Sequence, residues 1–219
     1  MTPIMRKLVK GFNDFRARYF NERQDLYTRL VRHGQKPKVA VIACADSRVD
    51  PAIVLQVEPG DIFAIRNVAN LIPPYDDGDG EAYHGTSAAI EFAVTKLGVE
   101  HLVVFGHAYC AGIQNMIDTQ EGAKTSGRFV NSWTSIAARA YTRAKKEFPE
   151  AKGEDLARCC EKNAVLVSLE NLKTFPFIQD GLKAGTLEIH GWYLNIAEGE
   201  LSSFDEKDGI YKPINGTLD

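Results

Sequence analysis

Residues 38–48 read KVAVIACADSR, an apolar run that ends in a thiol, a carboxylate and a guanidinium. The run is rich in β-branched residues and is bounded by polar ones, so it predicts a buried strand. Successive side chains on a strand point to opposite faces, so Cys44, Asp46 and Arg48 share one side if the extended geometry continues. The stretch therefore indicates either a solvated strand end or part of a chemical site.

Further apolar runs continue this pattern along the chain. Strands that alternate with helices predict an α/β fold with a central, mostly parallel sheet flanked by helices. We expect one domain over residues 1–219, with residues 1–34 as an N-terminal helical arm. The expected strands are 38–44, 61–67 and 101–107, the expected helices are 85–98, 110–118, 131–148 and 153–173, and residues 186–201 are expected to form a strand with a turn near Gly199.

The N-terminal arm carries aromatic and aliphatic residues at helical spacing over residues 5–34. Gly11 is a weak point in this pattern, which therefore predicts one or two amphipathic helices. An apolar stripe of this kind must pack either on the chain's own core or on a partner subunit.

Residues 72–85 differ from their surroundings in being acidic and rich in Gly and Pro. Such a composition predicts a surface loop, with a lid as the alternative. His84 lies in this segment and is expected to be a surface histidine.

The composition limits the classes of partner. With a net charge of -3, the chain lacks the excess of basic residues that binds nucleic acid or an anionic membrane. We find no segment apolar enough to span a bilayer and no signal-peptide pattern. Four cysteines in 219 residues do not make a disulfide framework, which favours a reducing cytoplasm where thiols bind metal or act in catalysis.

A second group of chemical side chains follows the expected strand at 101–107, where His107 ends the strand and Cys110 opens the next helix. Sites in open α/β sheets form at the carboxyl ends of parallel strands, so we expect these residues to meet Cys44. Two thiols and one imidazole are the ligands of a catalytic zinc that keeps a fourth position open. A helix start also favours the Cys110 thiolate.

Asp46 has two alternative roles at such a centre. It can be a fourth ligand that closes the site, or it can accept a hydrogen bond from a zinc-bound water. A bidentate pair with Arg48 occupies the carboxylate and keeps it ionised, which competes with coordination to the metal. We favour the Asp46–Arg48 pair.

Four motifs carry a resemblance: CADSRVDP (44–51), RNVANL (66–71), GTSAAIEFAV (85–94) and GHAYCAG (106–112). In order and approximate spacing they resemble the motifs of the β-class carbonic anhydrases, and more closely those of the plant-type branch. The resemblance implies Zn2+ as the cofactor, Cys44, His107 and Cys110 as its ligands, and Asp46–Arg48 as the catalytic dyad. It also implies a homodimer or higher homo-oligomer with the pocket at the dimer interface and the N-terminal helices around the partner.

The resemblance also implies the residues of the substrate pocket. Gln35 falls where the plant-type branch has a glutamine that hydrogen-bonds substrate or bicarbonate. Phe63 matches an aromatic residue of the pocket wall, and Phe92 stands where many members have a tyrosine. Val68 and Gly106 lie where the family lines its narrow pocket.

Two positions depart from the family pattern. Some bacterial members have a tryptophan at the position of Val41, as part of a bicarbonate site that switches the enzyme off, so we expect no such regulation here. Ala111 replaces a common glycine after the last metal ligand, and we expect the extra methyl group to be tolerated.

The implied reaction is the zinc-dependent, reversible hydration of CO2 to bicarbonate and a proton, by attack of zinc-bound hydroxide on the substrate. Two alternatives stay open on the sequence. One is a carbonyl sulfide or carbon disulfide hydrolase that uses the same zinc site. The other is a non-enzymatic zinc-binding protein in which Asp46 closes the site.

Overall fold

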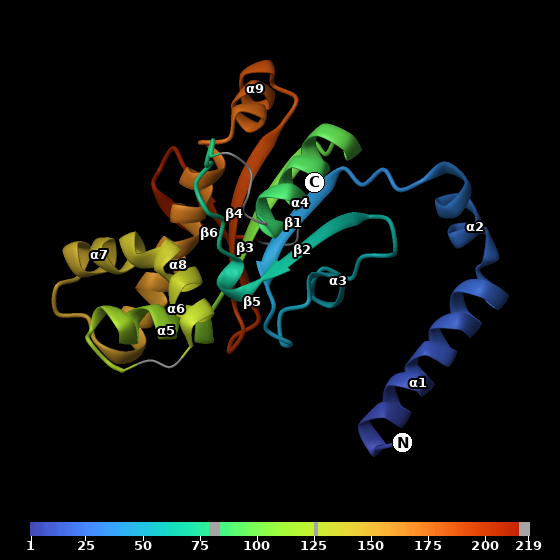
Figure 1. Ribbon diagram of the computed structural model, residues 1–219, viewed down its shortest axis with the longest axis horizontal. Coiled ribbons are helices and arrows are strands. Elements are labelled where there is room, and N and C mark those ends of the chain that lie inside the picture. Colours follow the sequence, from blue (N-terminus) through green and yellow to red (C-terminus); the bar gives the residue numbers. More distant parts are fainter. Residues whose placement is uncertain (79–83, 125–126, 215–219) are drawn as a thin grey trace. The chain divides into compact units, whose positions relative to one another are not determined.

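The computed structural model describes residues 1–78, 84–124 and 127–214 (Figure 1). The chain forms two compact units, Met1–Lys36 and Pro37–Asp219. Within the described residues, no helix has both the length and the hydropathy that a membrane span requires.

The first unit consists of α1 (Pro3–Arg16), the π-helical segment η1 (Ala17–Glu22) and α2 (Gln24–His33). These helical segments lie within the range predicted for the N-terminal arm. Gly11 does not interrupt it, because a single glycine in a helix costs only about 1 kcal/mol and α1 runs through it unbroken. The chain breaks instead at Arg23, which leaves helical geometry with φ -126°.

Aromatic residues of the first unit pack on one another at the junction of its helices. The rings of Phe15 and Tyr27 lie 5.5 Å apart edge to face, and Phe20 stacks on Tyr27 at 5.0 Å. Helix α1 itself buries none of its residues. Its apolar side chains Leu8 and Phe12 are each 59% exposed, so the predicted apolar stripe is largely uncovered.

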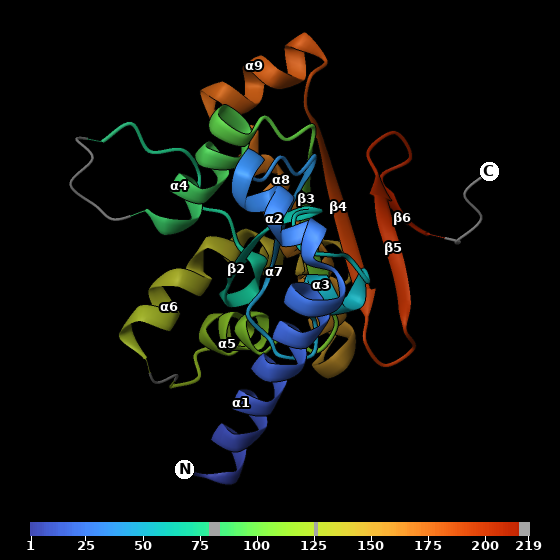
Figure 2. The same ribbon diagram turned by 90° about the vertical axis from the view of Figure 1, so that its right-hand side faces the viewer.

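The second unit is built on a six-stranded sheet in the order β2-β1-β3-β4-β5-β6. The first four strands of this order are parallel and the last two are antiparallel, so the predicted mostly parallel α/β sheet is confirmed. Figure 2 shows the β5–β6 hairpin beside β4. The strands are β1 (Val39–Cys44), β2 (Ile62–Asn67), β3 (His101–His107), β4 (Glu188–Asn195), β5 (Glu200–Asp205) and β6 (Ile210–Pro213).

The helices of the second unit follow the predicted ranges only approximately. Pro51–Val54 and Pro176–Ala184 were not predicted as helices. The segment expected over 85–98 is α-helical only in its first half, and the 3-10 segment Ser135–Ala137 interrupts the helix expected over 131–148. The predicted stop at Gly98 is confirmed, since this residue takes the left-handed conformation with φ 66°. The helices are α3 (Pro51–Val54), η2 (Val68–Asn70), α4 (Gly85–Glu91), η3 (Phe92–Leu97), α5 (Ala111–Gln120), α6 (Arg128–Thr134), η4 (Ser135–Ala137), α7 (Ala138–Glu147), α8 (Gly153–Leu172) and α9 (Pro176–Ala184).

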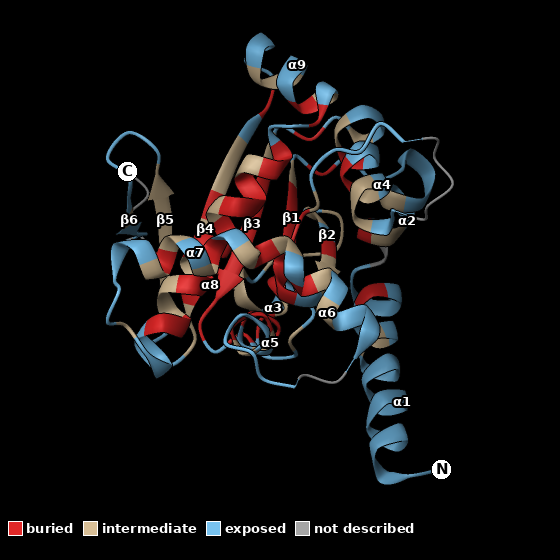
Figure 3. Ribbon diagram, turned by 60° about the vertical axis from the view of Figure 1, so that its left-hand side comes forward, coloured by how far each residue is buried: buried red, intermediate tan, exposed pale blue. Residues whose placement is uncertain are grey.

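Helix α8 covers one face of the sheet over β3 and β4. It comes so close that a Cβ on Gly106 would lie 2.4 Å from Val165, and one on Gly191 would lie 2.8 Å from Leu169. Val103 of β3 belongs to a second apolar cluster that also contains residues of α5, α7 and α8. Figure 3 shows buried residues concentrated along β1, β3 and α8.

The predicted loop over 72–85 lies only partly within the described residues, because 79–83 fall outside them. Ile72 is fully buried, so the described part does not begin as a surface loop. His84 is exposed, as expected, and directly precedes α4.

Candidate metal centre

Cys44, His107 and Cys110 come together at the carboxyl ends of β1 and β3, as predicted. In the parallel register Ala43 is opposite Phe105, so Cys44 and His107 end neighbouring strands. The three potential ligand atoms lie within 4.8 Å of one another, and all three residues are buried. Sequence separation therefore does not prevent the meeting, because parallel strands finish at the same edge of the sheet.

The donor atoms at this site fit a zinc ion. The Nδ1 of His107 lies 2.8 Å from the Ala108 carbonyl oxygen and donates to it, which leaves the other ring nitrogen as an acceptor. That Nε2 is buried and has no hydrogen-bond partner within the described part of the chain. A buried nitrogen of this kind is costly unless a ligand satisfies it, and a metal ion does so.

The spacing of the two sulfurs supports the same conclusion. Cys44 Sγ lies 4.0 Å from Cys110 Sγ, which is far too long for a disulfide. Two sulfurs bound tetrahedrally to zinc at about 2.3 Å each are about 3.8 Å apart. The observed pair is therefore close to the arrangement that one zinc ion imposes.

Negative charge is favoured at one of the two sulfurs. A hydrogen bond from the Cys110 sulfur lowers the pKa of Cys44 to about 4. The same contact, followed by burial, raises the pKa of Cys110, while N–H groups at the start of α5 act in the opposite direction. One thiolate is thus already stabilised, and a bound cation would stabilise the second.

Asp46 and Arg48 form the predicted bidentate ion pair. Arg48 donates from Nε to Oδ1 at 3.0 Å and from Nη2 to Oδ2 at 2.7 Å, and its backbone N–H donates to Oδ1 at 2.9 Å. These bonds hold the pKa of Asp46 well below its usual range. The carboxylate is therefore an ionised acceptor whose lone pairs are largely occupied by Arg48.

The backbone of Cys110 is supported by a buried carboxylate that the sequence did not indicate. Glu161 on α8 accepts the backbone N–H of Cys110 at 3.0 Å and the hydroxyl of Tyr193 at 2.8 Å. It also pairs with Arg158, whose Nη2 donates at 2.8 Å. These contacts fix the backbone from which Cys110 reaches the centre.

Tyr109 links this support to the Asp46–Arg48 pair. It has φ 59°, a left-handed conformation that costs a non-glycine residue free energy. Its carbonyl accepts from Arg48 Nη2 at 3.0 Å, and its ring lies under the guanidinium of Arg158 at 3.9 Å. The surrounding arginines therefore stabilise a strained turn between His107 and Cys110.

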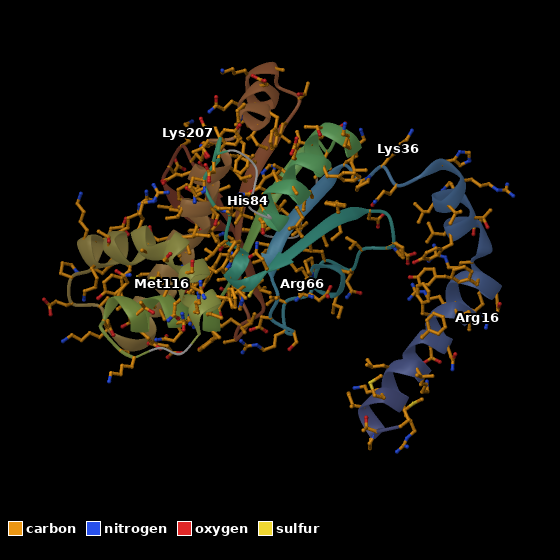
Figure 4. The ribbon with its side chains drawn as sticks, viewed as in Figure 1. Arg16, Lys36, Arg66, His84, Met116 and Lys207 are labelled. Carbon is orange, nitrogen blue, oxygen red and sulfur yellow. The ribbon has the colours of Figure 1, made fainter. Side chains whose placement is uncertain are left out.

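Arg66 holds the loop that follows β1. Its guanidinium donates to the carbonyl of Cys44 at 3.1 Å, to the carbonyl of Asp46 at 2.7 Å and to the carboxylate of Asp50 at 2.6 Å. Arg66 lies near the carboxyl end of β2 (Figure 4). Arg66 belongs to the RNVANL motif, but the sequence did not indicate this role for it.

The predicted pocket residues lie in different places. Val68 packs at the start of α5, where a Cβ on Gly112 would be 2.8 Å from it, so it is beside the metal centre. Phe63 is paired with Ala40, whereas Cys44 is four residues further along its strand, a separation of about 13 Å. Phe63 instead packs on Phe92 with ring centroids 6.0 Å apart.

The structure also shows the surroundings of Gly106 and Gln35, the two remaining residues that the resemblance places in the pocket. Gly106 does not line an open pocket, because the position of its missing side chain faces Val165 of α8. Gln35 belongs to the first unit and is exposed there.

The structure shows the surroundings of Val41 and Ala111, the two residues that depart from the family pattern. Val41 is fully buried in the sheet. Ala111 is exposed at the first position of α5, which is consistent with the expectation that its methyl group is tolerated. The crowded position is the next one, Gly112, where a Cβ would lie 2.9 Å from Ala69.

The fold and the centre together define an α/β protein with a buried Cys/His/Cys metal-type site at the ends of parallel strands. The family model for carbonic anhydrase matches residues 39–201. A carbonic anhydrase of Synechocystis sp. is 35% identical over 201 residues, covering 92% of this chain and 71% of that protein. The chain belongs to the β-class carbonic anhydrases, a family of enzymes.

Solved structures agree with this assignment. The β-carbonic anhydrase CcaA matches with a TM-score of 0.87 at 33% identity, covering 100% of this chain and 95% of that one. The β-carbonic anhydrase CafA of Aspergillus fumigatus matches with a TM-score of 0.79 at 25% identity, covering 93% and 91%. The predicted family is thus confirmed.

Proposed function

We propose that this enzyme holds a zinc ion between Cys44, His107 and Cys110 and catalyses the reversible hydration of CO2 to bicarbonate and a proton. The observation that carries the proposal is the Nε2 of His107, buried without a hydrogen-bond partner among the described residues and adjacent to two thiols at zinc-like spacing. When bound, zinc acts as a Lewis acid that lowers the pKa of a coordinated water towards about 7. Family membership supports the reaction, and the donor set supports the metal.

In this proposal Asp46 orients the reacting water and does not carry its proton away. Arg48 keeps the Asp46 carboxylate ionised, so that it accepts a hydrogen bond throughout the neutral pH range. A general base works best with a pKa near the working pH, and the pKa of Asp46 lies far below that. The proton therefore passes to solvent, while Asp46 and Arg48 hold the geometry.

The same contacts argue against Asp46 as a closing ligand. Both of its carboxylate oxygens are engaged by Arg48 at 3.0 and 2.7 Å. Coordination to a metal requires one of these charge-assisted bonds to be given up. We therefore propose an open fourth position, as an enzyme needs, and not a closed structural site.

We further propose that the substrate pocket is completed by a second copy of the chain. Val68 lies beside the centre of its own chain, whereas Phe63 and Phe92 pack together near the far end of β2. A pocket that contains all three residues and Gln35 therefore needs contributions from two chains. The uncovered apolar stripe of α1 supports a homo-oligomer, and the four free thiols support a cytoplasmic location.

Stopped-flow measurement of CO2 hydration tests the reaction, with sulfide release from carbonyl sulfide measured on the same preparation. We expect CO2 to be the far better substrate. A preparation that releases sulfide efficiently but does not hydrate CO2 would assign the site to the alternative hydrolase, and one that does neither would contradict an enzymatic role.

A further inference from the structure

A second group of metal-binding side chains lies at the opposite end of the sheet. His101 begins β3, while Glu188 and His190 belong to β4. Glu188 is paired with His101 and lies two residues before His190, so the three side chains project from one face of the sheet. The length of β3 separates them from the Cys/His/Cys centre by about 20 Å.

The three potential ligand atoms form a compact triangle. His101 Nδ1 is 3.2 Å from His190 Nε2, and Glu188 Oε2 is 3.7 Å from each of these nitrogens. The point equidistant from the three atoms is about 2.1 Å from each, which is the length of zinc–nitrogen and zinc–carboxylate bonds. The side chains of His101 and His190 are 40% and 31% exposed, so an ion can enter and keep water as further ligands.

The backbone holds two of the three ligands in place. The Lys38 carbonyl accepts the N–H groups of Glu100 and His101 at 2.8 and 3.0 Å, and the Glu188 N–H donates to the Glu100 carbonyl at 2.9 Å. The Lys38 ammonium pairs with the Glu100 carboxylate, so the positive charge of Lys38 beside this site is already partly neutralised. Ligands on strands keep their geometry better than ligands on loops, so little reordering opposes binding.

We propose that His101, Glu188 and His190 bind a divalent first-row transition metal. Two imidazoles and a carboxylate suit ions such as Zn2+, Ni2+ or Fe2+, whereas Mg2+ and Ca2+ take oxygen ligands. The ion joins His101, the first residue of β3, to Glu188 and His190 near the start of β4. It therefore stabilises the pairing of these strands and takes no part in CO2 hydration.

Titration of Zn2+ into the full-length enzyme that already carries one zinc per chain tests this proposal. Isothermal titration calorimetry is expected to show one further Zn2+ per chain in the wild type, its loss in His190→Asn and a weaker site in Glu188→Gln. His33→Asn is the matched control, because His33 is an exposed histidine on α2 outside the cluster. Added Zn2+ should raise the thermal unfolding midpoint of the wild type and of the control, but not of His190→Asn.

Two results overturn the proposal: a wild type that binds no further zinc, or a His190→Asn variant that binds as much as the wild type. CO2 hydration is measured on the same samples and should be equal in His190→Asn and the wild type. Loss of the second site therefore remains distinguishable from a failure of the proposed carbonic anhydrase reaction.

Discussion

Glu161 is the buried carboxylate that fixes the backbone of Cys110, and its replacement by glutamine should weaken both the fold and the metal centre. We predict that Glu161→Gln lowers the free energy of unfolding by about 2 to 4 kcal/mol. Glutamine keeps the size of the side chain, so the change isolates the charge and the hydrogen bonds.

The magnitude follows from the contacts of Glu161. Removing one partner of a buried ion pair costs about 3 to 5 kcal/mol, because the other charge stays buried. Arg158 is 24% exposed, so water relieves part of this cost. The amide group of glutamine also presents N–H donors where the carboxylate accepts from Cys110 and Tyr193, and an unmatched buried donor costs about 1 to 3 kcal/mol.

Urea unfolding at one fixed chain concentration measures the stability, and competition with a zinc chelator measures the metal affinity. Loss of a group that orients a metal ligand costs about 10- to 100-fold in affinity, and we expect Glu161→Gln to fall in that range. Glu170→Gln is the control on the same helix. Glu170 is 43% exposed in its pair with Arg143, so its loss should cost less than about 1 kcal/mol and leave zinc affinity unchanged.

The control carries its own pH dependence. The hydrogen bond from Arg143 lowers the pKa of Glu170 below its ordinary value of 4.5. The pair therefore stabilises the folded chain above that value and loses its contribution as the pH falls through the folded pKa. Equal stability and equal zinc affinity of Glu161→Gln and Glu170→Gln would refute the role given to Glu161.

Three substitutions and one labelling experiment test separate parts of the structure. Asp46→Asn should reduce CO2 hydration at least tenfold while zinc content stays unchanged, and loss of zinc in this variant would instead make Asp46 a ligand. Gly106→Ala should destabilise the fold by about 1 to 3 kcal/mol in urea unfolding, because its Cβ would lie 2.4 Å from Val165. Gly11→Ala, where a Cβ meets nothing within 4 Å, should be neutral or slightly stabilising. Burial raises the pKa of Cys160 to about 12, so thiol reagents at pH 8 should label it only after unfolding, and mass spectrometry of native labelled protein would reveal any earlier reaction.

Local patterns in the sequence predict most of the sheet and the metal centre. The apolar runs that end in Cys44 and His107 are long enough to indicate strands, and parallel strands bring their carboxyl ends together. Helix α9 was not predicted, although it has Pro176 at its first position and Gly185 after its end. Proline is common at the start of a helix and glycine just after its end. Strand β6 has only four residues, too few for a clear alternating pattern.

The supporting residues could not be predicted in the same way. A glutamate in a charged helix is normally solvated, and Glu161 is buried only because α8 packs against Cys110 and Tyr193. The meeting of His101 with Glu188 depends on the register between two strands far apart in the chain. Under the proposal that a second copy of the chain completes the pocket, Phe63 and Phe92 would reach the centre only from that copy, which no pattern within one chain describes.

The central claim is that one zinc ion, held by Cys44, His107 and Cys110, is required for CO2 hydration. The most direct test is the Cys44→Ser variant, with zinc content and stopped-flow CO2 hydration measured on the same chelator-washed sample and compared with wild type. We predict that tightly bound zinc and activity are lost together. Full CO2 hydration by Cys44→Ser, or by wild-type protein stripped of zinc, would contradict the assignment.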